Sequence, residues 1–362
     1  MNGLLLEFGF LKRLRESELW SRIGWFFGTS AGALNATIAA LDRLPELERF
    51  LLRLRPEETF RPNRLWRLPL LGTHDYVLPR TIEERLGNPV EIAEALARAP
   101  AEVVAVVTDV TLVDGDEADD DHRRLFERAY SSKRTPPAEM AQAVLASAAI
   151  NALVLPLAVG DRVATDGGWV RNFPLGYAYD RPEVEQIVAF RYESTYPAVG
   201  FGSIGHLARR LRRYSRLPAA RALIAELEEA AAREERGLPA HAIDTFSRLA
   251  RVAIMRNTEL EELVAQWREQ SVRELASLRE DIDALVDDEE LAARIDARFD
   301  EARFPFRHDR LVPRITVSGS VEGVSLEPGF RNVKPWTEPA KRELIARGWE
   351  LTDAELKTHG FG

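Results

Sequence analysis

The sequence predicts an α/β protein built on a largely parallel sheet. Runs of β-branched and aromatic residues have the composition of buried strands, and other runs have the spacing of amphipathic or small-residue helices. The predicted strands are residues 22–27, 101–110 and 184–192, and the predicted helices are residues 4–19, 31–43, 46–54 and 140–150. Because strands and helices alternate along the chain, we expect a parallel sheet covered by helices.

The later part of the chain predicts further elements. Residues 153–168 have the pattern of two strands joined at Gly160 and Asp161. Residues 204–302 are rich in Ala, Leu, Arg and Glu at helical spacing. A strand at 314–321 and a helix at 337–347 follow, and Thr352 and Glu355 predict a capping box for one more helical turn. We therefore expect three parts: a core over 1–192, a helical insertion or subdomain over 193–305, and a C-terminal strand and helix over 306–362 that complete the core.

Composition excludes several classes of protein. The net charge of −9 over 362 residues argues against a general nucleic-acid binder, which needs a basic face. The chain has no cysteine, so disulfides, thiolate zinc sites and cysteine nucleophiles are excluded. It contains no P-loop, dinucleotide fingerprint or H-E-x-x-H motif, and we expect neither a metal nor a cofactor. No apolar run is long enough to span a membrane and the N-terminus is not a signal peptide, so we expect a cytoplasmic protein.

One serine lies between two glycines where a predicted strand passes into a predicted helix. The motif is Gly28-Thr29-Ser30-Ala31-Gly32, a G-x-S-x-G sequence. A sharp strand-to-helix turn exposes a serine hydroxyl, and the N–H groups of the following helix point at developing negative charge. Ser30 is therefore a candidate nucleophile, with the N–H of Ala31 as the expected oxyanion donor.

Asp166 is the candidate base for this serine. It follows an apolar strand and precedes Gly167 and Gly168, which allow a tight turn around it. A carboxylate held against a serine hydroxyl can take its proton without an imidazole if burial raises the pKa of the carboxylate. An ordinary turn aspartate is the alternative.

Three segments together resemble the patatin-like phospholipases. They are GTSAG at 28–32, AVLASAAI at 143–150 and VATDGGWVRNFPL at 163–175. The similarity covers residues 3–192, and a weaker similarity extends to the last helix. It implies a three-layer fold with a mostly parallel central sheet, helices on both faces and a C-terminal helical segment.

The resemblance also implies roles for the two candidate residues. Ser30 would be the nucleophile and Asp166 the proton acceptor of a Ser-Asp dyad, within the Asp166-Gly167-Gly168 motif. The implied activity is lipid acyl hydrolysis through an acyl-enzyme intermediate. The family has a glycine-rich loop before its first helix, but this sequence begins Met1-Asn2-Gly3. We therefore expect the first strand and the leading glycines to be missing, with Gly3 as the remaining oxyanion donor of that loop.

Two other functions stay open at this point. A conventional Ser-Asp-His esterase would combine Asp166 with His206 or His241. A catalytically impaired lipid-binding protein would follow from the loss of the glycine-rich loop.

The expected partner is a lipid ester, and the sequence suggests where the chain would touch a membrane peripherally. Arginines between 209 and 216 could dock on anionic lipid, although the negative net charge favours a solvated helix paired with acidic neighbours such as Glu226. The sequence leaves open the head group, the acyl length, the role of residues 204–302 and the oligomeric state.

Overall fold

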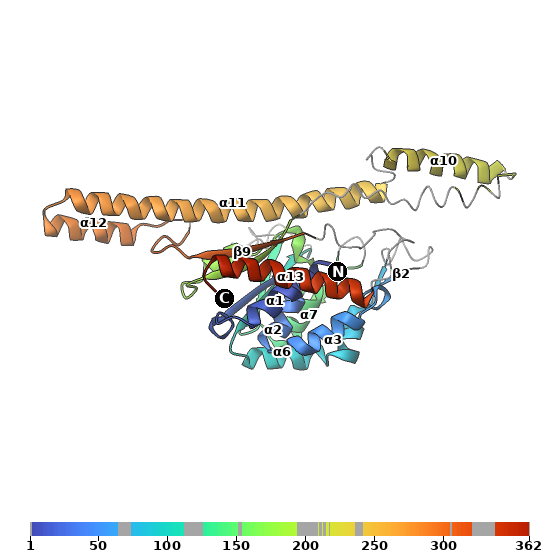
Figure 1. Cartoon of the computed structure of the whole chain (residues 1–362), viewed down its shortest axis with the longest axis horizontal. Helices are drawn as coiled ribbons and strands as arrows, with labels where there is room; N and C mark the ends of the chain where they lie inside the picture. Colours follow the sequence, from blue (N-terminus) through green and yellow to red (C-terminus); the bar gives the residue numbers. More distant parts are fainter. Residues whose placement is uncertain are drawn as a thin grey trace.

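The computed structural model shows a mixed α/β protein in which helices surround a central sheet (Figure 1). It describes residues 2–63, 74–111, 126–150, 154–193, 209, 212, 215–216, 218–235, 242–304, 306–320 and 337–361. Among these residues, none of the helices combines the length and the apolar content that crossing a membrane requires.

The helices and strands have the following bounds. The helices are α1 (Asn2–Arg15), α2 (Ala31–Ala40), α3 (Leu44–Arg53), α5 (Leu78–Arg85), α6 (Pro89–Arg98), α7 (Pro137–Ser147), α8 (Leu175–Tyr179), α10 (Pro218–Glu235), α11 (Ala242–Leu285), α12 (Glu289–Glu301) and α13 (Glu338–Thr358). The strands are β1 (Trp25–Thr29), β2 (Phe60–Pro62), β3 (His74–Tyr76), β4 (Glu102–Asp109), β5 (Glu127–Ser131), β6 (Leu157–Val159), β7 (Arg162–Asp166), β8 (Ile187–Tyr192) and β9 (Arg314–Gly319). Short 3₁₀ turns occupy Trp20–Arg22, Pro56–Glu58 and Gly167–Trp169.

The central sheet is less parallel than the sequence predicts. Its ladders join β1 to β4, β4 to β7 and β7 to β6, and β5 also pairs with β4. β1 and β4 are parallel, but β4–β5, β4–β7 and β6–β7 are antiparallel, so the expectation of a mostly parallel sheet is wrong for the described strands. One cause is the two-residue turn at Gly160 and Asp161, because such a turn joins antiparallel strands while a parallel pair needs a long crossover.

Two strands share one edge of β4. β5 pairs with residues 104–108 of β4, β1 pairs with residues 102–106 and β7 with residues 107–109. Because a residue in a strand can pair with only one strand on each edge, β1 and β7 both lie on the edge of β4 that faces away from β5. β1 runs parallel to β4 and ends with Thr29 beside Val106, while β7 runs antiparallel and ends with Asp166 beside Val107. The two strands consequently run towards each other, and their last residues meet at the middle of one edge.

Side chains of β1 alternate between two apolar clusters. Phe26 packs with the cluster formed by α2, α6, α7 and β4, whereas Trp25 and Phe27 pack with a cluster that includes α8. This alternation is what a strand with helices on both of its faces requires.

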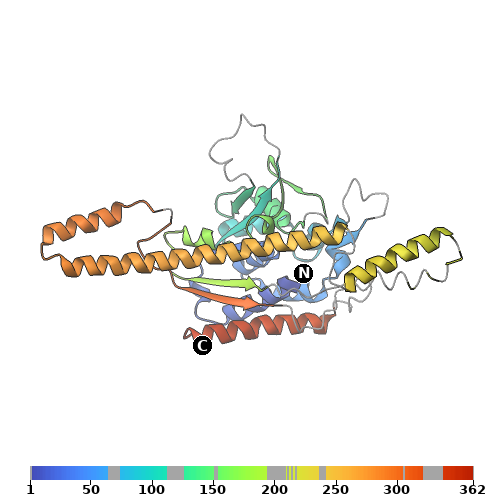
Figure 2. The same ribbon diagram turned by 90° about the horizontal axis from the view of Figure 1, so that it is seen from above.

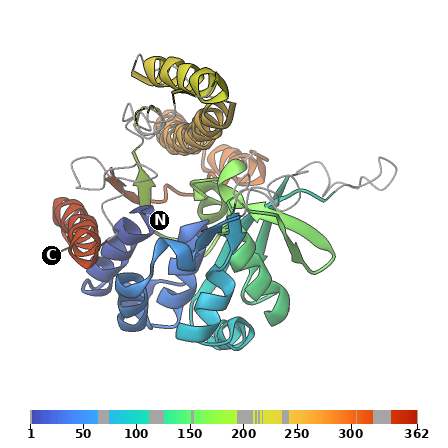
Figure 3. The same ribbon diagram turned by 90° about the vertical axis from the view of Figure 1, so that its right-hand side faces the viewer.

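α1 and α13 pack side by side at one edge of the molecule (Figure 3). Gly9 of α1 and Gly348 of α13 face each other so closely that a Cβ on either would overlap backbone atoms of the other helix. The buried Lys341 of α13 donates to the carbonyl groups of Leu51, at 2.8 Å, and Leu52, at 2.9 Å, at the C-terminal end of α3. A cation suits this end of a helix, where carbonyl groups lack intrahelical donors.

The helices predicted for residues 204–302 form an arm outside the core. α11 crosses the whole molecule, and α12 folds back beside its C-terminal end (Figure 2). Arg314 of β9 joins the arm to the small β8–β9 sheet through Glu262, at 2.7 Å, and Glu269, at 3.0 Å. The division of the chain into three parts stays a prediction.

The predicted end of the last helix is wrong. α13 continues to Thr358 instead of stopping near residue 347, and Thr352 lies inside it, where its hydroxyl donates to the Gly348 carbonyl at 2.7 Å. Glycine often ends helices, but α13 continues through Gly348, where the helix packs closely on α1.

The Gly9–Gly348 contact yields a stability prediction. We expect Gly348→Ala to lower the free energy of unfolding by about 1–3 kcal/mol, because the overlap with α1 outweighs the gain of roughly 1 kcal/mol in helix propensity. Denaturant unfolding measures the change. Gly24→Ala is the matched control, since a Cβ there meets nothing within 4 Å. Equal stability of the two variants would contradict the packing described here.

Candidate active site

Ser30 lies at a strained turn between β1 and α2. Its backbone has φ 56° and ψ −127°, a left-handed conformation that costs a non-glycine residue about 1–3 kcal/mol. Gly28 permits the turn, because a Cβ there would overlap the Gly32 carbonyl and the Ala33 N–H. The chain therefore has the geometry of a nucleophile elbow, with the serine at its tip.

Asp166 reaches this serine from β7. The Ser30 hydroxyl donates to Asp166 Oδ2 at 2.6 Å, and the Gly168 N–H donates to Oδ1 at 2.7 Å. Both carboxylate oxygens are thus held by hydrogen bonds, which fix the orientation of the side chain. The contact follows from the head-to-head arrangement of β1 and β7.

β4 and the segment that follows α7 position the backbone of Asp166. Thr108 Oγ1 donates to the Asp166 carbonyl at 2.7 Å, and the Asp166 N–H donates to the Ala149 carbonyl at 3.0 Å. Gly167 packs so closely on the Val106 carbonyl that a Cβ would overlap it.

Ser147 links the serine turn to the central strand. Its hydroxyl accepts a hydrogen bond from the Ser30 N–H at 2.8 Å and donates to the Val106 carbonyl at 2.6 Å. Ser147 is fully buried, so this hydroxyl satisfies two backbone groups that water does not reach. The small-residue motif of α7 therefore has a structural role, because its serine holds the tip of the elbow.

Burial sets the protonation of Asp166. The residue is 7 % exposed, and burial raises its pKa to about 6, although the hydrogen bonds from Ser30 and Gly168 oppose the shift. Asp166 is then ionised at neutral pH and is still far more basic than an exposed aspartate. This is the environment that a general base requires.

Ser30 opens into an apolar cavity of about 520 Å³. The wall also contains the two expected oxyanion donors, Ala31 and Gly3. Each lies in the first turn of a helix, α2 or α1, where N–H groups have no intrahelical acceptor. Apolar side chains that line the cavity include Phe10, Leu11, Leu14, Ile23, Phe27, Leu175, Ile187 and Phe190.

Glu7, a carboxyl group that the sequence analysis missed, lines this cavity. Glu7 of α1 accepts a hydrogen bond from Asn35 Nδ2 at 3.1 Å and lies beside Gly32 in the first turn of α2. Burial raises the pKa of Glu7 to about 7, and the bond from Asn35 opposes the shift. In the sequence, Glu7 is one polar residue in an amphipathic helix, so no local signal distinguishes it.

Helix α11 holds the loop that follows Asp166. Asn257 Nδ2 donates to the Trp169 carbonyl at 2.5 Å, and Asn172 Nδ2 donates to Thr258 Oγ1 at 2.8 Å. Glu261 forms an ion pair with Arg171 of the same loop. The partners are separated by 86 to 90 residues, and therefore no motif could reveal them.

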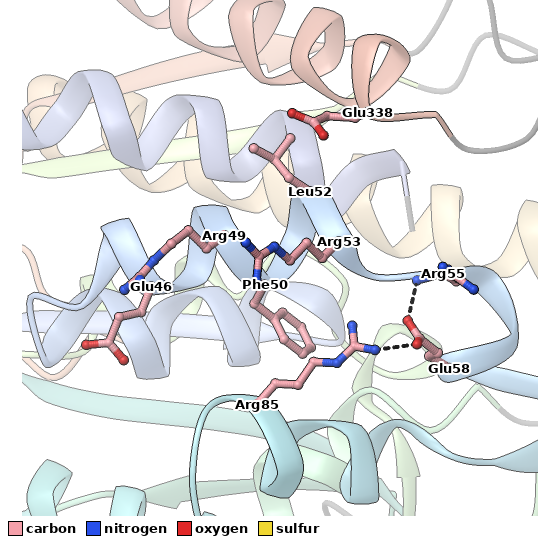
Figure 4. Close-up of a pocket in the computed structure, with 9 residues that line it drawn as sticks. All are labelled: Glu46, Arg49, Phe50, Leu52, Arg53, Arg55, Glu58, Arg85 and Glu338. Atoms are coloured by element: carbon pink, nitrogen blue, oxygen red, sulfur yellow. Dashed lines mark hydrogen bonds and ion pairs between the residues drawn. The ribbon is translucent and has the colours of Figure 1, made fainter.

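Another cavity, of about 720 Å³, is separate from these residues (Figure 4). It is lined by Glu46, Arg49, Phe50, Leu52, Arg53, Arg55, Glu58, Arg85 and Glu338. Arg85 pairs with Glu58 across it, so part of its charge is internally compensated. It contains no residue of the Ser30–Asp166 pair, and we place the candidate site at the apolar cavity.

The alternative residues considered above lie elsewhere or outside the described residues. His206 and His241, with which a conventional triad could be built, lie outside them, as do Arg210 and Arg213 of the basic stretch. Arg212 pairs with an acidic neighbour, Glu228, at 2.7 Å. Within the described ranges, no group of three or more His, Asp or Glu side chains could hold a metal ion.

Comparison with known families agrees with the motifs. The model of the family described as patatin-like phospholipase matches residues 4–179. This segment is a patatin-like phospholipase domain. The match contains both Ser30 and Asp166, and it supports membership of the lipid acyl hydrolases. No curated protein matches the sequence.

The Ser147 bridge of this patatin-like domain can be tested by stability. We expect Ser147→Ala to lower the free energy of unfolding by about 1–3 kcal/mol, because it leaves the Ser30 N–H and the Val106 carbonyl buried without partners. Denaturant unfolding measures the change. Ser21→Ala is the control, since that hydroxyl is exposed and bonds locally to the Glu18 carbonyl. A loss no larger than that of the control would show that Ser147 does not support the elbow.

Proposed function

We propose that this protein hydrolyses lipid esters with a Ser30–Asp166 dyad through an acyl-enzyme intermediate. The observation that carries the proposal is the 2.6 Å hydrogen bond to a buried carboxylate from Ser30, a strained serine in the wall of an apolar cavity. The patatin-like domain supports the same class of activity.

The first half of the reaction acylates Ser30. Asp166 accepts the hydroxyl proton while Ser30 Oγ attacks the ester carbonyl, which becomes a tetrahedral oxyanion. The C–O bond to the leaving alcohol then breaks, and Asp166 gives its proton to the departing alkoxide. The products are a neutral alcohol and an acyl group on Ser30, with Asp166 again ionised.

The second half uses water in the place of the alcohol. Asp166 removes a proton from a water molecule, and the hydroxide attacks the acyl-serine carbonyl. Collapse of the second tetrahedral intermediate releases the fatty acid and returns the proton from Asp166 to Ser30. The helical N–H of Ala31, and that of Gly3 in the cavity wall, would stabilise the oxyanion in both halves.

The cavity favours a long acyl chain over a small polar acid. Its apolar side chains would shield a bound acyl chain from water, while the ester group lies next to Ser30. Phospholipids, lysophospholipids and acylglycerols all offer such an ester.

Covalent labelling tests the nucleophile. We expect a fluorophosphonate probe to modify Ser30, with labelling abolished in Ser30→Ala and slowed about 10²–10⁴-fold in Asp166→Asn, because the base is lost. Each labelling rate is measured on protein whose thermal unfolding matches that of the unmodified chain. Replacement of each of the six histidines by alanine is the companion series.

Retained labelling in all histidine variants supports the dyad. Loss in His206→Ala or His241→Ala would instead establish a Ser-Asp-His esterase. If the folded protein neither reacts with the probe nor hydrolyses lysophospholipid, the result would instead support a catalytically impaired lipid-binding protein.

The pKa of Asp166 predicts the acid limb of the activity. Because the base must be ionised, kcat/KM should fall as the pH drops through about 6, by about tenfold per pH unit further down. Steady-state hydrolysis of a soluble ester between pH 4.5 and 8 measures this limb. Glu7→Gln is the control, since Glu7 titrates near pH 7 in the same cavity. If the limb moved with this substitution, it would belong to Glu7 and not to Asp166.

A further inference from the structure

Helix α11 has two distinct faces, and one of them is buried against the body of the protein. Thr258 and Ala265 are each 2 % exposed, and Val272 is 6 % exposed. Figure 1 shows the α/β body on one side of this helix only.

The opposite face of α11 carries large apolar side chains that are exposed. Trp267 is 59 % exposed and Leu285 is 83 % exposed. The stripe, as we name it, consists of Leu249, Leu260, Trp267, Leu278 and Leu285. An apolar surface of this length on a helix commonly marks an interaction site.

Sequence spacing shows that the residues of the stripe share one side of the helix. Leu249, Trp267 and Leu285 are 18 residues apart in succession, which is five full turns of an α-helix. Leu260 and Leu278 differ from them by 11 residues, which is close to three turns. These side chains therefore follow one line along a helix of 44 residues.

We propose that the stripe binds the stripe of a second copy of this chain, with the two α11 helices antiparallel and the two-fold axis beside residue 265. This residue lies close to the midpoint of Ala242–Leu285, so the two helices overlap over nearly their full length. The α/β bodies then lie on opposite sides of the helix pair.

Charge complementarity selects this arrangement. Arg256 and Glu274 lie within the stripe, 18 residues apart and thus on the same side of the helix. They are nine residues on either side of residue 265, so Arg256 of one copy faces Glu274 of the other, twice in the dimer. Arg256 contacts Glu259 of its own helix at 3.6 Å. Its side chain is 63 % exposed, and it is therefore still accessible to a partner.

The same register pairs apolar residues. Val252 faces Leu278 of the second copy, and Leu263 faces Trp267, because each pair is symmetric about residue 265. Val252 and Leu278 are 47 % and 49 % exposed in the single chain, so both would lose contact with water on pairing.

A second copy fits this face better than a lipid surface does. Glu274 and Asp281 interrupt the stripe, and an interfacial helix would have to bring these carboxylates to the apolar edge of the membrane. In the antiparallel pair Glu274 meets an arginine instead.

Charge reversal tests the pairing in the full-length chain. Sedimentation equilibrium should show a dimer, and Arg256→Glu or Glu274→Arg should each raise its Kd about tenfold or more through two repulsive contacts. The double variant should return the Kd to near its original value. Glu280→Arg is a matched control that leaves the Kd little changed.

Cysteine chemistry tests the direction of the helices, since the natural chain has no cysteine. Trp267→Cys should cross-link to itself with a short bis-maleimide, because the two copies are only about 6 Å apart along the axis. Leu278→Cys should not, because its copies are separated by about 39 Å along the axis. A mixture of Val252→Cys and Leu278→Cys proteins should form the mixed cross-link.

Several outcomes would overturn the proposal. A monomer at every concentration would do so, as would failure of the double charge reversal to restore association. Self-cross-linking of Leu278→Cys would mean parallel helices. A monomer that binds phosphatidylcholine vesicles through Trp267, and loses binding in Trp267→Glu, would assign the stripe to membranes. None of these results depends on hydrolysis, so they leave the proposed reaction untouched.

Discussion

The ends of β1 and β7 meet on one edge of β4, and the candidate site depends on this constraint. The adjacent residues Val106 and Val107 are where the two ladders end. A shift of either strand by one position would also turn its side chains to the other face. The hydrogen bond between Ser30 and Asp166 is therefore a consequence of strand register, and distant parts of the chain serve to hold that register.

Several features reinforce the meeting point. Ser147 connects the serine turn to Val106, and Thr108 connects β4 to the backbone of Asp166. The strained backbone at Ser30 persists because these buried bonds surround it. Burial then gives Asp166 the basicity that the proposed reaction needs, so one packed region supplies both geometry and electrostatics.

α11 connects this region to the surface. One face of the helix holds the loop after Asp166 through Asn257, Thr258 and Glu261, and the other carries the stripe. A partner bound to the stripe would therefore contact the same helix that positions the loop after Asp166. In a dimer formed through α11, the candidate site of each copy would be connected to the interface in the same way.

Local sequence patterns predicted many of the helices and strands, but not the pairing of strands that are distant in the sequence. The strand before Ser30, the hairpin at Gly160 and the helices over residues 204–302 follow from spacing and turn residues, and all are present. The antiparallel ladders of β4 with β5 and β7 depend on contacts between distant segments, which periodicity does not encode. Glu7 and the partners of Arg171 were missed for the same reason: their surroundings are assembled only in the folded chain.

The central claim is that Ser30 carries the acyl group between the two halves of the reaction. The most direct measurement is mass spectrometry of the tryptic peptide covering residues 23–43, which contains one serine, after rapid acid quench of the enzyme turning over a slow long-chain ester. The account predicts a peptide heavier by one acyl group, with the modification on Ser30 and less of it after longer reaction. Release of the alcohol with an unmodified Ser30 throughout turnover would contradict it.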